Sequence, residues 1–183
     1  MRTESQDDPA SPGSLDAGSD FDRFFRQQFP IVARTVALVV HDFETGQDVA
    51  QESFARLYVR WERMESQEHA RNFVFKVAIN MARSHLRRQR RQLAARLEGP
   101  GRTALVDEAA RAADRVTLAA ALGGLSGRQR VCLALVDYAE LEVRTVARLL
   151  RIRSSTVRVH LSRGRRALAQ ALESTYEERS HDA

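Results

Sequence analysis

The chain has 183 residues and a mass of 20.7 kDa, which suits one medium domain or two small ones and excludes a large catalytic core with accessory modules. Apolar residues make up 43% and charged residues 29%, so most of the chain can bury a core. No window approaches the roughly eighteen apolar residues of a membrane span, and the first residues are acidic and polar. We therefore expect no membrane span, no signal peptide and a cytoplasmic location.

The basic residues are concentrated in two stretches. Sixteen of the twenty-nine lie in Arg71–Arg96 and Arg144–Arg166, eight in each, and neither stretch contains an acid. The rest of the chain carries thirteen basic and twenty-four acidic residues. This pattern predicts a protein that contacts a polyanion at two places, with nucleic acid as the first candidate. All the basic residues except Lys76 are arginine, which suits bidentate phosphate and guanine contacts, and a GC-rich genome explains the same bias equally well.

The N-terminal half is predicted to be a helical domain preceded by a tail. Residues 1–19 form a disordered acidic tail in this prediction, because Leu15 is their only large apolar residue after Met1. From Asp20 onward Phe and Val recur mostly at three- and four-residue steps, which indicates a helix. Pro30 is expected to begin a second helix or to kink the first.

A break over His41–Gly46 is expected to precede an amphipathic helix. Its apolar face carries Ala50, Phe54, Leu57 and Trp61, with Tyr58 beside it, and its acidic outer face carries Asp48, Gln51 and Glu52. After a polar break over Glu62–His69, a long helix begins apolar and ends almost wholly basic. Gly99, Pro100 and Gly101 should stop that helix, so 20–97 is the first domain and 98–106 a flexible linker.

The C-terminal half is predicted to be a second helical domain over 107–173, followed by a tail over 174–183. Its four helices are expected at Asp107–Leu122, Arg128–Tyr138, Glu142–Leu150 and Ser155–Leu172, with Ser126 and Ser154 as N-caps of the second and fourth. No β-type alternation is present anywhere in the chain. The predicted fold class is all-α, with two small helical domains joined by the linker.

The last two helices have the spacing of a helix-turn-helix. Their apolar residues can pack across a turn of three or four residues: Val143, Val146, Ala147, Leu150 and Ile152 against Val157, Leu161 and Leu168. The outward residues of the second helix would then be Ser155, Thr156, Arg158, Val159, His160, Ser162 and Arg163. Arg158 and Arg163 can contact guanine or phosphate. An ordinary helical hairpin with a solvated charged face is the alternative, and the lack of any acid favours DNA.

Catalysis is disfavoured by the residues available. The single cysteine, Cys132, lies in the apolar sequence VCLALV and is predicted to be a small buried hydrophobe rather than a nucleophile. The five histidines are far apart and lack metal-ligand spacing, so we expect no metal and no cofactor. Asp48 and Glu52 could share a metal at i, i+4, but no histidine lies beside them in the sequence to complete a ligand set.

Three motifs resemble one known family. LSGRQR at Leu125–Arg130 and the segment Ala139–Leu168 look like the C-terminal promoter-binding domain of sigma-70-family initiation factors. QDVAQESF at Gln47–Phe54 and FVFKVAIN at Phe73–Asn80 resemble the N-terminal domain of the same family. The motifs occur in the family's order, and a basic run directly follows the second. The most similar class is the small extracytoplasmic-function sigma factors, over roughly residues 20–172.

The resemblance implies roles for both domains. The acidic helix, through Asp48, Gln51 and Glu52, would bind the β′ clamp helices of core RNA polymerase; a solvated helix face is the alternative for these charges. The next helix would recognise and melt the −10 element through Phe73, Lys76, Asn80, Arg83, Arg87, Arg88, Arg90 and Arg91. From the residues alone, at least one of Phe73 and Phe75 belongs to the core, and Asn80 is equally explained as a hydrogen-bonded buried amide.

The resemblance also assigns the second domain. It would bind the −35 element through Arg144, Ser155, Thr156, Arg158, Val159, His160, Ser162, Arg163 and Arg166. The partners implied are core RNA polymerase, including its β flap, and promoter DNA, and an anti-sigma factor is common in the family. A one-component repressor or activator that binds duplex DNA as a dimer is the rival hypothesis; the second basic stretch with Phe73 and Asn80 argues against it, because a sensor domain does not need these residues.

Overall fold

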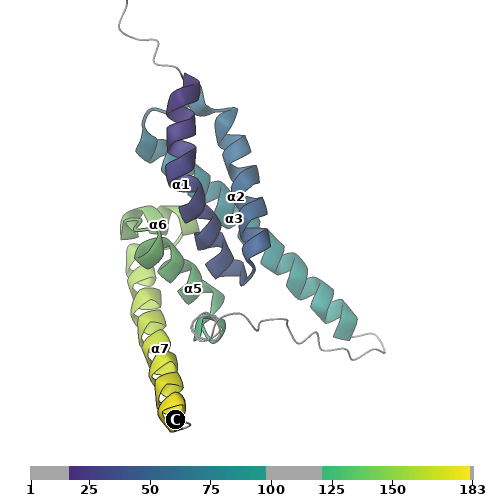
Figure 1. Ribbon diagram of the computed structural model, residues 1–183, viewed down its shortest axis with the longest axis vertical. Coiled ribbons are helices and arrows are strands. Elements are labelled where there is room, and N and C mark those ends of the chain that lie inside the picture. The colour runs from purple at the N-terminus through teal and green to yellow at the C-terminus, as the bar shows by residue number, and fades with distance from the viewer. Residues whose placement is uncertain (1–16, 98–120, 182–183) are drawn as a thin grey trace, which may run out of the picture.

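The computed structural model describes residues 17–97 and 121–181, and all regular structure in these ranges is helical (Figure 1). The N-terminal unit comprises α1 (Ala17–Val40), α2 (Phe43–Tyr58), the 3₁₀ turn η1 (Trp61–Arg63) and α3 (Gln67–Leu97). The C-terminal unit comprises α5 (Gly127–Leu133), the π-helical turn η2 (Ala134–Tyr138), α6 (Val143–Leu150) and α7 (Ser154–His181). The all-α prediction is confirmed. The predicted linker, most of the helix predicted at 107–122 and residues 1–16 of the predicted tail lie outside the described residues.

Helix α1 runs without interruption through Pro30. The prediction that a second helix begins there is wrong, because the apolar face continues on both sides of the proline: Phe24, Val32 and Val36 are all buried. Proline has no N–H to bond to the carbonyl four residues earlier in a helix. Pro30 is exposed, so that carbonyl lies on the solvent side of α1, where water can bond to it instead. The helix also starts at Ala17, before the predicted Asp20.

The turn between α1 and α2 is shorter than predicted. His41 ends α1 in the left-handed region at φ 62°, and Asp42 caps α2 by accepting the Thr45 backbone N–H at 2.9 Å. The Thr45 hydroxyl also donates to this carboxylate, and both bonds hold the pKa of Asp42 below its ordinary value. Gly46, expected in the break, lies inside α2, where an added Cβ would come within 2.7 Å of the Ala33 carbonyl oxygen. The glycine allows α1 and α2 to approach closely.

An aromatic cluster fills the space between α1, α2 and η1. Phe54 of α2 is buried against Phe24 and Phe25, with ring centroids 6.1 and 5.0 Å away. Trp61 was expected on the apolar face of α2, but that helix ends at Tyr58 and the indole comes from η1. Its ring centroid lies 5.3 Å from that of Phe21, so Trp61 joins η1 to the cluster.

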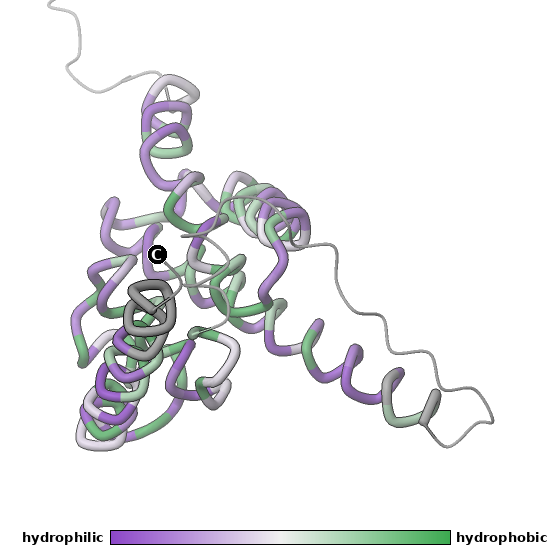
Figure 2. The backbone as a smooth tube through the Cα atoms, turned by 60° about the horizontal axis from the view of Figure 1, so that its bottom comes forward, coloured by the Kyte–Doolittle hydropathy of each residue, from purple (hydrophilic) through white to green (hydrophobic). Residues whose placement is uncertain are grey.

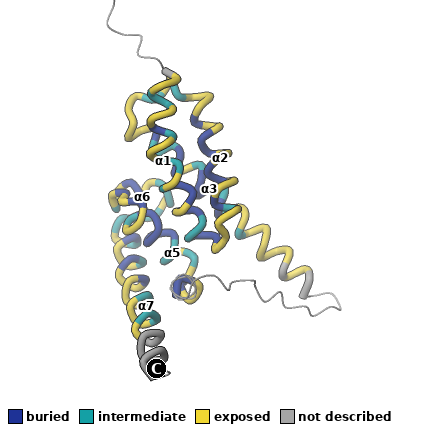
Figure 3. Tube along the Cα trace, in the orientation of Figure 1, coloured by how far each residue is buried: buried dark blue, intermediate teal, exposed yellow. Residues whose placement is uncertain are grey.

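Helix α3 changes character along its length, as predicted. In its first half Val74, Phe75, Ala78, Ile79 and Ala82 are buried against α1 and α2. From Arg87 onward the side chains that the structure describes are exposed, and the helix projects from the body of the molecule (Figure 3). The exposed half is the basic half, so it remains available to a polyanion.

The C-terminal unit begins with the predicted N-cap. The Ser126 backbone N–H donates to the Gln129 side chain at 2.8 Å, and the Gln129 N–H donates back to the Ser126 hydroxyl at 3.4 Å, which forms a capping box. Ser154 was expected to cap the last helix, but α7 already includes it, and the Val157 N–H bonds to the carbonyl of Arg153. Helix α7 also continues to His181, past the predicted end at Leu172.

The two units pack against each other through α1, α3, α5, η2 and α6. The Arg71 guanidinium of α3 donates to the carbonyl of Ala139, and Arg130 of α5 donates to Val39 at 3.4 Å and to Leu125 at 3.2 Å. Burial and then the charge of Arg90 hold the pKa of Arg130 below its ordinary value. We call this arrangement, in which the two units are in contact, the closed form. The periodicity of single helices does not predict it.

Candidate nucleic-acid and polymerase interfaces

Helices α6 and α7 form the predicted helix-turn-helix. The turn is Arg151–Arg153, and Arg151 takes the left-handed conformation at φ 55° while the Ile152 N–H bonds to the Ala147 carbonyl at 3.0 Å. The apolar residues predicted to meet are all in the core: Val146, Ala147, Val157 and Leu161 buried, and Val143, Leu150, Ile152 and Leu168 partly buried. The brace of one helix on the other is therefore confirmed.

Most of the predicted −35 residues share one exposed surface of α7. The exposed side chains are Ser155, Arg158, Val159, Ser162, Arg163 and Arg166, and Arg144 of α6 is also exposed. Val159 has 46% of its surface exposed and so presents an apolar side chain among these polar and basic ones. We call these six α7 residues the α7 surface. Arg165 lies outside it, because a bidentate pair at 2.9 and 2.5 Å ties Arg165 to Asp137 of η2.

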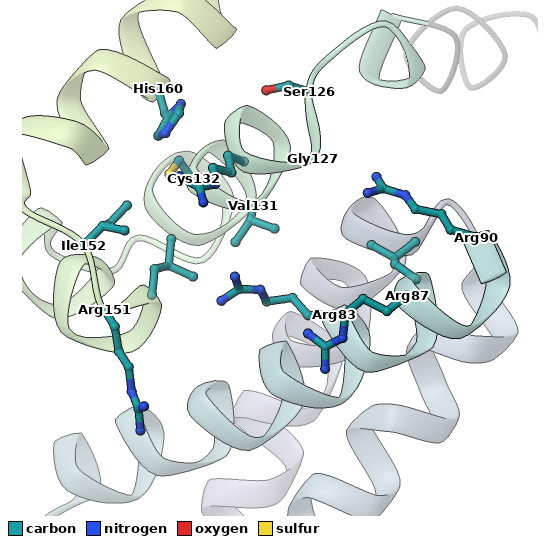
Figure 4. Close-up of a pocket in the computed structure, with 13 residues that line it drawn as sticks. Arg83, Arg87, Arg90, Ser126, Gly127, Val131, Cys132, Arg151, Ile152 and His160 are labelled. Atoms are coloured by element: carbon teal, nitrogen blue, oxygen red, sulfur yellow. The ribbon is translucent and has the colours of Figure 1, made fainter.

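Two predicted residues do not lie on the α7 surface. Thr156 is half-buried, and His160, expected to point outward, is half-buried with its Nε2 atom enclosed and without a hydrogen-bond partner among the described residues. His160 lies three residues after buried Val157 and four before buried Gly164, so it falls on the border of the core. It lines a cavity with Cys132 instead of projecting from α7 (Figure 4).

The acidic residues of α2 lie on its solvent side, as predicted. Asp48, Gln51 and Glu52 are exposed, and Glu52 forms an ion pair with Arg56 at 2.9 Å. Glu44, four residues before Asp48, is exposed as well and extends this acidic row by one turn. The i, i+4 spacing was the signal for it in the sequence. The opposite side of α2, with Val49, Ala50 and Phe54, is buried, so the acidic row faces away from the core and can meet a partner.

The two phenylalanines of α3 have different environments. Phe75 is fully buried, which confirms that at least one belongs to the core, whereas Phe73 is partly buried beneath the Arg60 guanidinium at 5.5 Å. Phe73 and Lys76 line a groove of about 440 Å³ that α3 forms with Thr145, Arg148 and Leu149 of α6. Asn80 is exposed, so the buried-amide alternative is wrong.

The arginines of α3 divide into two groups. Arg83, Arg87 and Arg90 line a cavity of about 500 Å³ between α3 and the C-terminal unit, whereas Arg88 and Arg91 are exposed and do not line it (Figure 4). The other side of the cavity includes Ser126, Arg128 and Arg151, which sequence reasoning did not assign to any site. The signals available were the LSGRQR motif, which contains Ser126 and Arg128, and the second basic stretch, which contains Arg151.

Cys132 is a buried structural residue, as predicted. Its side chain is fully enclosed, and burial raises the pKa of its thiol to about 11, with the charge of Arg128 acting in the opposite direction. The thiol is therefore protonated at neutral pH and a poor nucleophile. Among the described residues, no helix is long and apolar enough to cross a membrane. The projecting end of α3 is mostly hydrophilic, with isolated hydrophobic residues (Figure 2).

Comparison with known proteins assigns both units. Residues 24–92 match the family model for sigma-70 region 2, and residues 115–168 match the model for sigma-70 region 4. The chain is 27% identical over 153 residues to the RNA polymerase sigma-E factor of Streptomyces coelicolor, covering 84% of this chain and 86% of that protein.

Two solved structures share the fold. The sigma factor RpoE from Bartonella quintana, in complex with the anti-sigma factor NepR, has a TM-score of 0.69 and 17% identity, over 85% of this chain and 98% of that one. CnrH, in complex with the cytosolic domain of CnrY, has a TM-score of 0.60 and 18% identity, over 86% and 90%. With region 2 and region 4 matched in order along one helical chain, the protein belongs to the sigma-70 family, in its extracytoplasmic-function class.

Proposed function

We propose that this protein binds core RNA polymerase and directs promoter-specific initiation of transcription, with the C-terminal unit on the −35 element and the N-terminal unit on the −10 element. The α7 surface carries the proposal: an exposed row of polar and basic side chains on a helix braced by α6, in the segment that matches region 4. Arg158 and Arg163 would make the base or phosphate contacts there, with Arg144 and Arg166 toward the backbone.

The −10 element would be bound by α3. Phe73 would stack on an unpaired base, Lys76 and Asn80 would contact the bases or backbone nearby, and the arginines from Arg83 to Arg91 would track the phosphates. Each stacked step that opens costs about 1.4 kcal/mol, and a base captured on an aromatic ring returns about 1–3 kcal/mol. One or two captured bases offset only a few steps, so the protein needs polymerase contacts to hold a transcription bubble.

The acidic row on α2 would bind the β′ clamp helices. An acidic surface repels DNA, so a basic protein surface is the partner that its charge fits. The C-terminal unit would contact the β flap. In this proposal the protein performs no covalent chemistry, works in the cytoplasm, and is held inactive by an anti-sigma factor, as the complexes of RpoE and CnrH suggest by analogy.

Reversing the charges of Asp48 and Glu52 with lysine is expected to weaken binding to core RNA polymerase by tenfold or more, about 1.4 kcal/mol, because like charges then face the basic partner. Both side chains are exposed, so the helical circular dichroism and the thermal midpoint should stay unchanged. The affinity is measured by titrating labelled protein with purified core enzyme.

The matched control reverses two exposed acids outside the acidic row, Asp22→Lys and Glu62→Lys, for the same change in net charge. The control should bind like the unaltered protein. Equal affinity for all three proteins would show that the acidic row of α2 does not contact the polymerase, and equal weakening in both variants would assign the effect to net charge.

A further inference from the structure

The cavity between α3 and the C-terminal unit exists only in the closed form. Its volume of about 500 Å³ lies within the range of small-molecule sites, and both units line it. We propose that this cavity binds a small anion with at least two linked phosphates, and that the bound anion holds the two units in the closed form. The α6–α7 turn and His160 line this site, but neither the α7 surface nor the acidic row on α2 takes part in it.

Five arginines line the cavity. Arg83, Arg87 and Arg90 line the cavity from α3, and Arg128 and Arg151 line it from α5 and the α6–α7 turn. In Figure 4 the Arg83 side chain reaches toward the C-terminal unit, whereas the Arg151 side chain extends away from the other labelled arginines. No Asp or Glu is among the described residues that line the cavity. Five like charges around one space repel one another, so the closed form concentrates positive charge that an anion would neutralise.

The donors match phosphate in geometry as well as charge. A guanidinium presents paired N–H groups that bind two phosphate oxygens at once. Arg87 already donates to Ser84 at 2.8 Å, and for the other four no ion pair is formed within the described residues. The enclosed Nε2 of His160 also lacks a partner and, as an N–H tautomer, can donate to an anion.

The size and lining point to more than a single phosphate. The guanidinium groups come from two separate units, and one phosphate is too small to bind all of them across a cavity of about 500 Å³. Apolar side chains of Leu86, Val131, Leu150 and Ile152 form part of the wall. A diphosphate therefore matches the arginines of the cavity, and a nucleoside attached to it would cover the apolar side chains. Inorganic pyrophosphate and a nucleoside diphosphate both contain the required pair of linked phosphates.

Occupation of this cavity would oppose promoter binding, a consequence that rests on the function proposed above. Arg83, Arg87 and Arg90 belong to the proposed −10 surface and also line the cavity, so an anion bound there would compete with DNA for the same guanidinium groups. A ligand that binds only the closed form multiplies the ratio of closed to open molecules by 1 + [L]/Kd. The anion would thus act as an inhibitor without touching the α7 surface.

The test is isothermal titration of the full chain, without DNA or polymerase, using inorganic pyrophosphate, orthophosphate and guanosine diphosphate. We expect one saturable site per chain for pyrophosphate, weaker binding of orthophosphate, and the tightest binding for the nucleotide. Arg128→Gln with Arg151→Gln should weaken pyrophosphate binding by about tenfold or more. The matched control, Arg26→Gln with Arg34→Gln, removes two exposed arginines of α1 and should leave binding unchanged.

Small-angle scattering of the same samples measures the conformation. Added pyrophosphate should lower the radius of gyration of the unaltered chain, or hold it at the value of the closed form, and should not change that of the Arg128/Arg151 variant. Absence of saturable binding, equal affinity for orthophosphate, or equal loss in the control variant would overturn the proposal. Equal affinity of pyrophosphate and the nucleotide would identify the inorganic anion as the ligand. Because no promoter or polymerase is present, these results do not depend on whether the protein supports transcription.

Discussion

Replacing Arg158 and Arg163 with alanine is expected to abolish transcription that depends on a −35 element and to leave binding to core RNA polymerase intact. Both side chains are exposed on the α7 surface, while the helix is held by Val157 and Leu161 on its other side. Each bidentate contact with a base is worth about 1–3 kcal/mol, so the loss of two lowers promoter affinity by roughly thirtyfold at least. The measurement is multi-round transcription in vitro, alongside core-enzyme titration.

The control for this experiment is Arg26→Ala with Arg34→Ala, which removes two exposed arginines from α1 and should leave promoter use unchanged. Full transcription from the Arg158/Arg163 variant would contradict the assignment of the −35 contacts to α7. Loss of polymerase binding in that variant would contradict the separation of the two interfaces.

Gly46→Val is expected to destabilise the N-terminal unit by about 1–3 kcal/mol, because the new side chain overpacks the contact between α1 and α2. An added Cβ lies 2.7 Å from the Ala33 carbonyl oxygen and 2.9 Å from the Ala37 Cβ, so backbone must shift. In a chain of this size the thermal midpoint should fall by roughly 2–12 °C, as measured by circular dichroism.

Gly123→Ala is the matched control for Gly46→Val. It is also a glycine at a helical position, but nothing lies within 4 Å of its added Cβ, so this change should be neutral or slightly stabilising. A midpoint for Gly46→Val that equals the control would mean that α1 and α2 do not approach as closely as the structure has them.

The sequence was most informative where the determinants are local. The helix-turn-helix depends on apolar residues within one or two turns of each other and on a three-residue turn, so periodicity alone located it. The Ser126 cap and the acidic side of α2 are local in the same sense. Each was predicted with its main residues, apart from Glu44.

Glycine and proline misled the local prediction where tertiary contacts decide. Gly46 was interpreted as a break, but the close approach of α1 requires a residue without a side chain there. Pro30 was a candidate helix start, but the buried residues on both sides of it keep α1 continuous. In both cases the outcome depends on how neighbouring helices pack together, and the local sequence does not give that packing.

The closed form could not be predicted because its contacts join distant residues. Arg71 bonds to Ala139 and Arg130 to Val39, and no periodic pattern relates them. The same holds for the cavity: Arg83, Arg87 and Arg90 were assigned to one extended helix, and Arg128 and Arg151 were assigned to no site. The inward position of His160 is a smaller case: it neighbours core positions on both sides, and its polar character favoured an outward prediction.

In the function proposed above, this protein gives core RNA polymerase its promoter specificity. The most direct test is transcription in vitro with purified bacterial core enzyme on a library of promoter fragments, with and without the protein. We expect new transcripts that appear only with both proteins present and start downstream of a shared pair of −35 and −10 sequences. DNA binding without any polymerase-dependent transcript would contradict it and would favour a repressor or activator that acts on duplex DNA alone.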